Sequence, residues 1–111
     1  MIIKSKILIN VFSLNFARAM ALYPFILIKH EELRNDKFII NHEKIHLRQQ
    51  VEMLIIFFYL WYLMEFLIKF IKYKNRRKAY ENISFEKEAY DNECNLNYLT
   101  ERKFYSFLKY L

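Results

Sequence analysis

Residues 41–50 read Asn41-His42-Glu43-Lys44-Ile45-His46-Leu47-Arg48-Gln49-Gln50. They lie in a segment without proline or glycine, and Asp36 ahead of them is a suitable N-terminal cap for a helix. The sequence therefore predicts a helix that begins near Asp36 or Lys37 and continues through the quoted residues. In that helix His42 and His46 are four residues apart, which places both imidazoles on one face, one above the other.

This pair of histidines has the spacing of a metal site. Two imidazoles one helical turn apart match two nitrogen ligands of a zinc ion, and catalytic zinc takes three protein ligands and leaves one position open. Glu43 is placed to take a proton from a metal-bound water and to return it to a leaving amine. A later carboxylate-rich segment offers Glu86 and Glu88 as the third ligand. The alternative is a chance match on a solvated helix, which binds nothing.

The composition favours a single, mainly helical domain. The chain has 111 residues, of which 55% are hydrophobic and 19% aromatic, so residues 1–111 are expected to form one domain with a core. Glycine is absent and Pro24 is the only proline. Glycine-rich phosphate loops and tight glycine hairpins are therefore excluded, and long helices become the default architecture.

The N-terminal region is mostly apolar and allows two interpretations. Residues 7–14 followed by Ala17-Arg18-Ala19 resemble the core and cleavage site of a signal peptide. The alternative is that the region is structural. Residues 22–28 are apolar and contain Pro24, which is tolerated on an edge strand, so we expect an edge strand there. The charged residues 30–37 are then expected to form a turn or loop.

Residues 51–71 continue the helix and are apolar on nearly every face. A helix of this length, about 31 Å at 1.5 Å per residue, could cross a bilayer. Residues 72–78 then form a basic cluster, and the whole chain has a net charge of +6. Such a net positive charge indicates either a solvated charged face or contact with an anionic membrane surface. Nucleic acid is the weaker candidate, because no recognised nucleic-acid motif accompanies the charge.

A span over residues 51–71 conflicts with the metal site. A straight helix climbs about 39 Å from His46 to Lys72, and the chain from there to Glu86 reaches at most about 50 Å when fully extended. An extended return through hydrocarbon would leave its backbone groups unpaired. If the ligands meet, the helix has to bend, and we expect a break between residues 59 and 65. The apolar helix then lies in the core or in a membrane interface.

Two further helices are expected in the second half of the chain. Asn82 or Ser84 is a suitable cap for a helix that runs to about Leu99 and carries the two candidate glutamates in its first turn. Thr100 is a suitable cap for a last amphipathic helix over residues 101–111.

The order of these motifs resembles a known enzyme family. His42-Glu43-x-x-His46 followed by Glu86-Lys87-Glu88-Ala89 is similar to the gluzincin branch of zinc metallopeptidases, whose shortest members, the minigluzincins, are about this size. The resemblance implies a small zincin-like α+β domain with a long active-site helix, one short edge strand or small sheet, and a second, glutamate-bearing helix. It also implies that the strand over residues 22–28 binds substrate as an added strand.

The resemblance leaves two alignments for the third ligand. The family places this glutamate in a Glu-x-x-Ala-Asp or Glu-x-x-x-Asp setting. Alignment on Ala89 makes Glu86 the ligand and puts Tyr90 where the family has aspartate, and we favour this alignment. The other makes Glu88 the ligand and puts Asn92 at that position. Because the aspartate normally orients a histidine ring through its second nitrogen, its replacement bears on catalysis more than on metal binding.

The sequence thus predicts a zinc-dependent metallopeptidase, a hydrolase that cleaves peptide bonds in peptides or proteins with metal-activated water and is membrane-associated or cytoplasmic. We expect His42, His46 and Glu86 to bind Zn²⁺ and Glu43 to be the catalytic residue. One alternative is a catalytically inactive zincin-like binding protein. The other is a small membrane protein in which the pentad is accidental.

Overall fold

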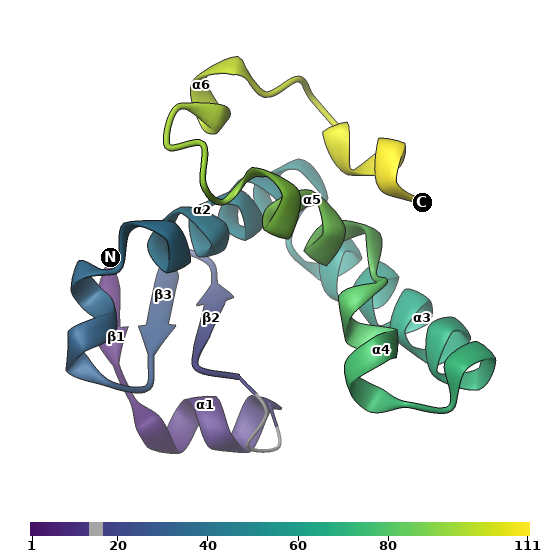
Figure 1. Cartoon of the computed structure of the whole chain (residues 1–111), viewed down its shortest axis with the longest axis horizontal. Coiled ribbons are helices and arrows are strands. Elements are labelled where there is room, and N and C mark those ends of the chain that lie inside the picture. Colours follow the sequence, from purple (N-terminus) through teal and green to yellow (C-terminus); the bar gives the residue numbers. More distant parts are fainter. Residues whose placement is uncertain (14–16) are drawn as a thin grey trace.

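Three short strands form a mixed sheet in the N-terminal part of the fold (Figure 1). The computed structural model describes residues 1–13 and 17–111. The strands are β1 (Ile2–Lys4), β2 (Ala19–Leu22) and β3 (Phe25–Ile28), in the order β1-β3-β2. β1 is parallel to β3, and β2 is antiparallel to it. Together with the helices below, the sheet makes this a mainly helical α+β fold, as the sequence predicted.

The expectation of one edge strand over residues 22–28 is wrong. Pro24 lies in the tight turn between β2 and β3, and its peptide bond with Tyr23 is cis. At this position the sheet requires no backbone N–H, which proline lacks. The residues after the turn form the central strand β3, and the preceding β2 is one of the two edge strands.

The segment that resembles a signal peptide contributes to the fold. β1 pairs with β3, and α1 (Lys6–Ser13) buries Ile9 completely. Residues 14–16 of that segment lie outside the described residues.

The helix with the two histidines begins as predicted. A 3-10 helix, η1 (Glu31–Asn35), replaces the expected loop, and α2 (Lys37–Glu52) follows it. The Asp36 carboxylate accepts hydrogen bonds from the backbone N–H groups of Phe38 and Ile39, each at 3.1 Å, so Asp36 is confirmed as the N-cap. Ile26 and Ile28 of the sheet pack with Leu33 of η1 and Ile40 of α2 in the first of two core clusters.

The long apolar helix is separate from α2, and the expected position of the break is wrong. α2 ends at Glu52 and α3 (Ile56–Tyr73) begins after three intervening residues, with a bend of 113° between the two helices. Leu54 and Ile55 turn the chain with φ values of 55° and 62°. The break lies here because Glu52 is held from outside the helix: its carbonyl oxygen accepts from the Tyr105 hydroxyl at 3.1 Å and its carboxylate accepts from the Tyr105 N–H.

Within the described ranges, no helix on its own has the length and apolar composition to cross a membrane. α2 and α3 meet that test only when taken together as a bent pair.

The second half of the chain folds back over α2 and α3. α4 (Arg76–Glu81) runs beside α3, and α5 (Ser84–Asn92) crosses α2 (Figure 1). α5 ends earlier than expected, and its N-cap residue is Ile83. The Glu65 carboxylate of α3 takes over the capping role, because it accepts from the backbone N–H of Ser84 at 2.9 Å and from the Ser84 hydroxyl.

The expected last helix over residues 101–111 is also wrong. The chain forms a single turn, α6 (Tyr98–Glu101), and then a 3-10 helix, η2 (Ser106–Tyr110). Phe107 of η2 completes the second core cluster with Phe58 of α3 and with Ile83 and Phe85 at the start of α5. This cluster fixes α5 against α3 and thereby sets the position of Glu86.

Candidate metal centre

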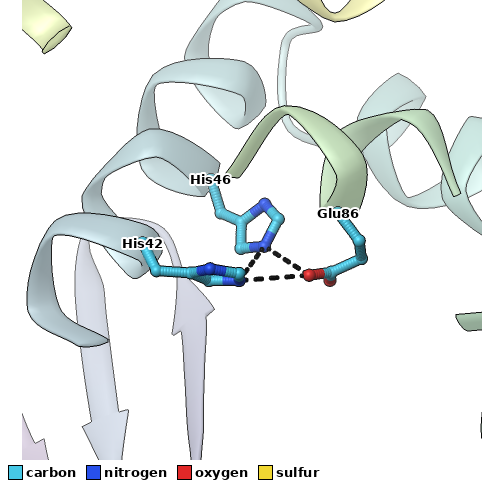
Figure 2. A group of neighbouring side chains, drawn as sticks. All are labelled: His42, His46 and Glu86. Carbon is cyan, nitrogen blue, oxygen red and sulfur yellow. Dashed lines mark hydrogen bonds and ion pairs between the residues drawn. The ribbon is translucent and has the colours of Figure 1, made fainter. Parts of the chain in front are cut away.

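Two side chains of α2 and one of α5 meet at a single point between the helices (Figure 2). The His42 Nε2 and His46 Nε2 atoms are 3.2 Å apart, and the Glu86 Oε1 atom lies 3.1 Å from the first and 3.0 Å from the second. All three side chains are buried. The three atoms therefore form a nearly equilateral triangle inside the protein.

The other nitrogen of each imidazole has its own hydrogen-bond partner. His42 Nδ1 lies 2.9 Å from Glu93 Oε1, and His46 Nδ1 lies 2.8 Å from Gln49 Oε1. Gln49 has to present its oxygen to the ring, because its Nε2 donates to the Phe85 carbonyl at 3.2 Å and to Glu88 Oε1 at 2.9 Å. A carboxylate is likewise an acceptor. Both Nδ1 atoms are therefore the donors of the neutral rings.

It follows that both Nε2 atoms of the neutral imidazoles carry lone pairs. These two lone pairs converge on the Glu86 Oε1 atom, which is also an electron donor. Three atoms that all carry lone pairs repel one another at such short separations. They therefore require positive charge between them, either as protons or as a metal ion. In a tetrahedral zinc site with bonds of 2.0–2.1 Å, neighbouring ligand atoms are roughly 3.3–3.4 Å apart. The distances between the three atoms observed here are only slightly shorter than that.

The protonated state of the cluster shows how strongly the carboxylate attracts positive charge. Burial opposes a charge on His46, but the nearby Glu86 carboxylate outweighs burial and raises the pKa of His46 to about 9. Burial also opposes ionisation of Glu86, yet the imidazoles, above all that of His46, hold the pKa of this carboxyl well below its usual range. The cluster thus holds cations readily, which suits a divalent metal ion.

The second carboxylate oxygen of Glu86 is also fixed. Tyr62 of α3 donates its hydroxyl proton to Glu86 Oε2 at 2.7 Å. Burial and this carboxylate raise the pKa of Tyr62 well above its ordinary value, so the hydroxyl stays protonated. Glu86 is therefore oriented with Oε1 toward the histidines and is left with one oxygen for a metal.

A cavity of about 420 Å³ opens beside the cluster. Glu43 and His46 of α2 line it together with Glu86, so two of the three candidate ligands and the candidate base face the same space. Its walls are mostly apolar: β2 contributes Ala19, Met20, Ala21 and Leu22, and α3 contributes Phe58, Tyr59, Tyr62, Leu63 and Phe66. Burial raises the pKa of Glu43, which brings a carboxylate closer to the range suited to a general base.

The structure places the second candidate ligand elsewhere. Glu88 points to the opposite side of α5, where Arg102 forms a salt bridge with it and Tyr98 donates to it at 2.6 Å. Arg102 also binds Glu52 of α2. Glu88 therefore reaches the metal cluster only indirectly, through Gln49.

Three residues around the cluster were missed from the sequence. Glu93, Gln49 and Tyr62 hold the atoms of His42, His46 and Glu86 that face away from the triangle. Gln49 is one helical turn after His46, so the spacing could have indicated it. Glu93 follows Glu86 by seven residues, two helical turns, and places its carboxylate beside His42 Nδ1. Tyr62 comes from α3, and no local pattern points to it.

Tyr90, which the expected alignment puts in place of an aspartate, packs its ring edge-on against His42. The two ring centres are 4.5 Å apart. The Tyr90 hydroxyl instead lies 3.3 Å from the Tyr80 hydroxyl. Tyr90 therefore restricts the His42 ring by contact, while Glu93 fixes its tautomer.

Comparisons of this chain with protein-family models, with curated proteins and with solved structures find no match.

Proposed function

We propose that this protein is a zinc-dependent peptidase in which His42, His46 and Glu86 hold the metal. The observation that carries the proposal is the convergence of two imidazole Nε2 atoms and one carboxylate oxygen on a single buried point. The donor set of two imidazoles and one carboxylate is that of catalytic zinc, which keeps a fourth position open. Zinc bound there would polarise a carbonyl and lower the pKa of a water molecule.

Glu43 is the proposed general base. It follows His42 directly in α2 and lines the cavity beside the cluster, so a water between the cluster and the substrate lies within its reach. Its raised pKa lets it accept a proton from this water and then deliver the proton to the nitrogen of the leaving amine. The resemblance to gluzincins assigns the same role to the glutamate of the pentad.

The sheet edge offers a way to hold an extended peptide along the cavity. β2 is one of the two edge strands, and its residues line the cavity opposite α3. The Gln50 side chain already bonds the Ala21 carbonyl at 2.8 Å and the Tyr23 N–H at 2.9 Å. A substrate strand therefore has the Ala19 end of β2 for its backbone hydrogen bonds. The walls of the cavity are mostly apolar and favour apolar side chains, and Arg76 also lines the cavity.

Metal content and cleavage test this proposal together. Purified wild-type protein and Glu43→Gln are expected to retain about one zinc per chain in elemental analysis. The double variant His42→Ala plus His46→Ala is expected to retain none. Glu43→Gln should lower peptide-library cleavage at least ~100-fold, since it removes the base without removing a ligand.

Two results would overturn the proposal. Zinc retained by the double histidine variant would place the metal elsewhere. If neither the wild type nor Glu43→Gln cleaves the peptides although both contain zinc, the result would favour the catalytically inactive binding protein.

A further inference from the structure

The solvent-exposed face of α3 is apolar along the whole helix. Its first and last exposed positions, Ile56 and Ile71, are 69% and 74% exposed. Between them the exposed large side chains of the same helix are Phe57, Tyr59, Leu60, Leu63, Met64, Leu67, Ile68 and Phe70. Contiguous exposed apolar surface of this kind marks an interaction site far more often than a solvated face.

The polar groups of α3 point inward, which reverses the usual pattern of a surface helix. Glu65 is buried, where it caps α5 and accepts from Trp61 Nε1 at 2.7 Å. Tyr62 is directed to Glu86. Lys69 is the only other charged residue before Lys72, and it is half-buried. The outward face therefore has no charge over about four turns, although a water-facing helix normally places its charges there.

The C-terminal end of this face is strongly basic. Lys72 lies in the last turn of α3, and Lys74, Arg76, Arg77 and Lys78 follow within six residues, in the turn and in α4. All five are exposed. α4 lies beside α3 in Figure 1, so the positive charges lie at one end of the apolar face. An apolar face with a basic border is the pattern of a helix that lies in the headgroup region of an anionic bilayer.

We propose that the apolar face of α3 and the basic cluster at its end dock this protein on an anionic lipid bilayer, with α3 in the plane of the interface. A second copy of the chain is a poorer occupant, because pairing two such faces would bring two basic borders together unless the helices were antiparallel. Tyr62 joins α3 to the candidate metal cluster from the inward side of the helix, so docking through the outward face leaves the cluster intact.

Docking would also place the cavity beside the lipid. Leu63 belongs to the apolar face and lines the cavity as well. If the protein is a peptidase, as proposed above, its substrates would then be segments of polypeptide close to the membrane surface. The docking itself does not depend on that function.

Vesicle co-sedimentation tests the docking surface. We expect the wild type to bind phosphatidylcholine vesicles that contain phosphatidylserine, and to bind pure phosphatidylcholine much more weakly. Lys72→Ala and Lys74→Ala should each weaken binding to the anionic vesicles roughly fivefold. Lys44→Ala, at an exposed lysine of α2, is the matched control and should bind as the wild type does.

The apolar part is tested by Leu60→Glu plus Leu67→Glu, which should abolish binding. Leu96→Glu plus Phe104→Glu removes two exposed apolar residues outside α3 and should leave binding unchanged. Zinc content and circular dichroism of each variant report folding and the metal site separately from docking. A further measurement uses variants that still bind. Vesicles with brominated acyl chains should quench the fluorescence of the tryptophan introduced in Phe57→Trp and not that of the tryptophan introduced in Leu96→Trp.

Equal binding by the α3 variant and its control would overturn the proposal, as would equal quenching at the two tryptophan positions. Absence of vesicle binding together with dimerisation that Leu60→Glu plus Leu67→Glu abolishes would assign the face to a second copy instead. Failure of zinc binding with vesicle binding retained would leave the docking surface standing and remove only the peptidase.

Discussion

At the scale of single residues, the candidate metal centre depends on the hydrogen-bond partners of its three candidate ligands. Glu93 accepts from His42 Nδ1, and Gln49 accepts from His46 Nδ1, so each ring presents its Nε2 lone pair to the cluster. Such partners fix the tautomer and raise the basicity of a ligating histidine. The spacing of the histidines and the choice of Glu86 over Glu88 were within reach of the sequence. The role of Glu93 could not be predicted from the sequence, because its side chain lies beside His42 only as a result of α5 crossing α2.

Removing the partner of His42 is expected to weaken the site without abolishing it. Glu93→Gln should lower zinc affinity about 10- to 100-fold in a chelator competition titration, since the ring loses its carboxylate acceptor. Glu101→Gln, at an exposed glutamate of the same C-terminal region, is the control. Unchanged affinity in Glu93→Gln would show that the ring needs no such partner.

The metal-free protein is expected to lose stability as the pH rises. His46 has a pKa of about 9 in the folded chain and an ordinary value of 6.5. A pKa raised by folding adds stability that is fully present below pH 6.5 and is lost as the pH rises through about 9. Urea denaturation in the presence of a chelator should therefore give a lower free energy of unfolding at pH 9 than at pH 6. Glu86→Gln should remove most of this difference, and a pH dependence unaffected by it would contradict the assignment.

Zinc binding should show the opposite pH dependence, because it requires neutral imidazoles and releases their protons. Its affinity is expected to rise over the same range.

At the scale of elements, the break between α2 and α3 shows what sequence reasoning could and could not supply. The need for a break followed from chain length, because Glu86 had to return to His46. The position of the break could not be predicted in this way, because residues 53–55 contain no glycine or proline and are compatible with a continuous helix. The helix ends at Glu52 because Tyr105, more than fifty residues later, bonds both its carbonyl and its carboxylate. The sheet was misjudged for a related reason, since a proline turn divides what looked like one strand.

The positive φ at the break predicts a stabilising substitution. Leu54 has a φ of 55° and is 71% exposed, so Leu54→Gly relieves the backbone and removes little packing. The free energy of unfolding should rise by up to ~1 kcal/mol. Val51→Gly, also at an exposed position but inside α2, should lower it by about 1 kcal/mol. A comparable loss in both variants would mean that the turn at Leu54 is not strained.

At the scale of the whole molecule, one arginine joins three distant segments. Arg102, in the C-terminal segment, has a fully buried side chain that forms salt bridges with Glu52 at the end of α2 and Glu88 of α5. Glu88 in turn accepts from Gln49, the partner of His46. The C-terminal segment is thus connected to the metal centre through hydrogen bonds. No sequence pattern indicated this connection, because Arg102 is one of many basic residues in a basic chain.

Removing this arginine is expected to be severe. Arg102→Ala leaves two buried carboxylates without their cation, which should lower the free energy of unfolding by ~3–5 kcal/mol in urea denaturation. Lys103→Ala, at the exposed neighbouring position, should change it by less than ~0.5 kcal/mol. Similar, small effects in both would mean that the network contributes little to folding.

X-ray absorption at the zinc edge of the purified protein tests the metal centre most directly. We predict a first shell of nitrogen and oxygen atoms at about 2.0–2.1 Å with the scattering pattern of two imidazoles and no sulfur. Absence of bound zinc, a single imidazole, or a sulfur ligand at about 2.3 Å from Cys94 would contradict the centre built from His42, His46 and Glu86.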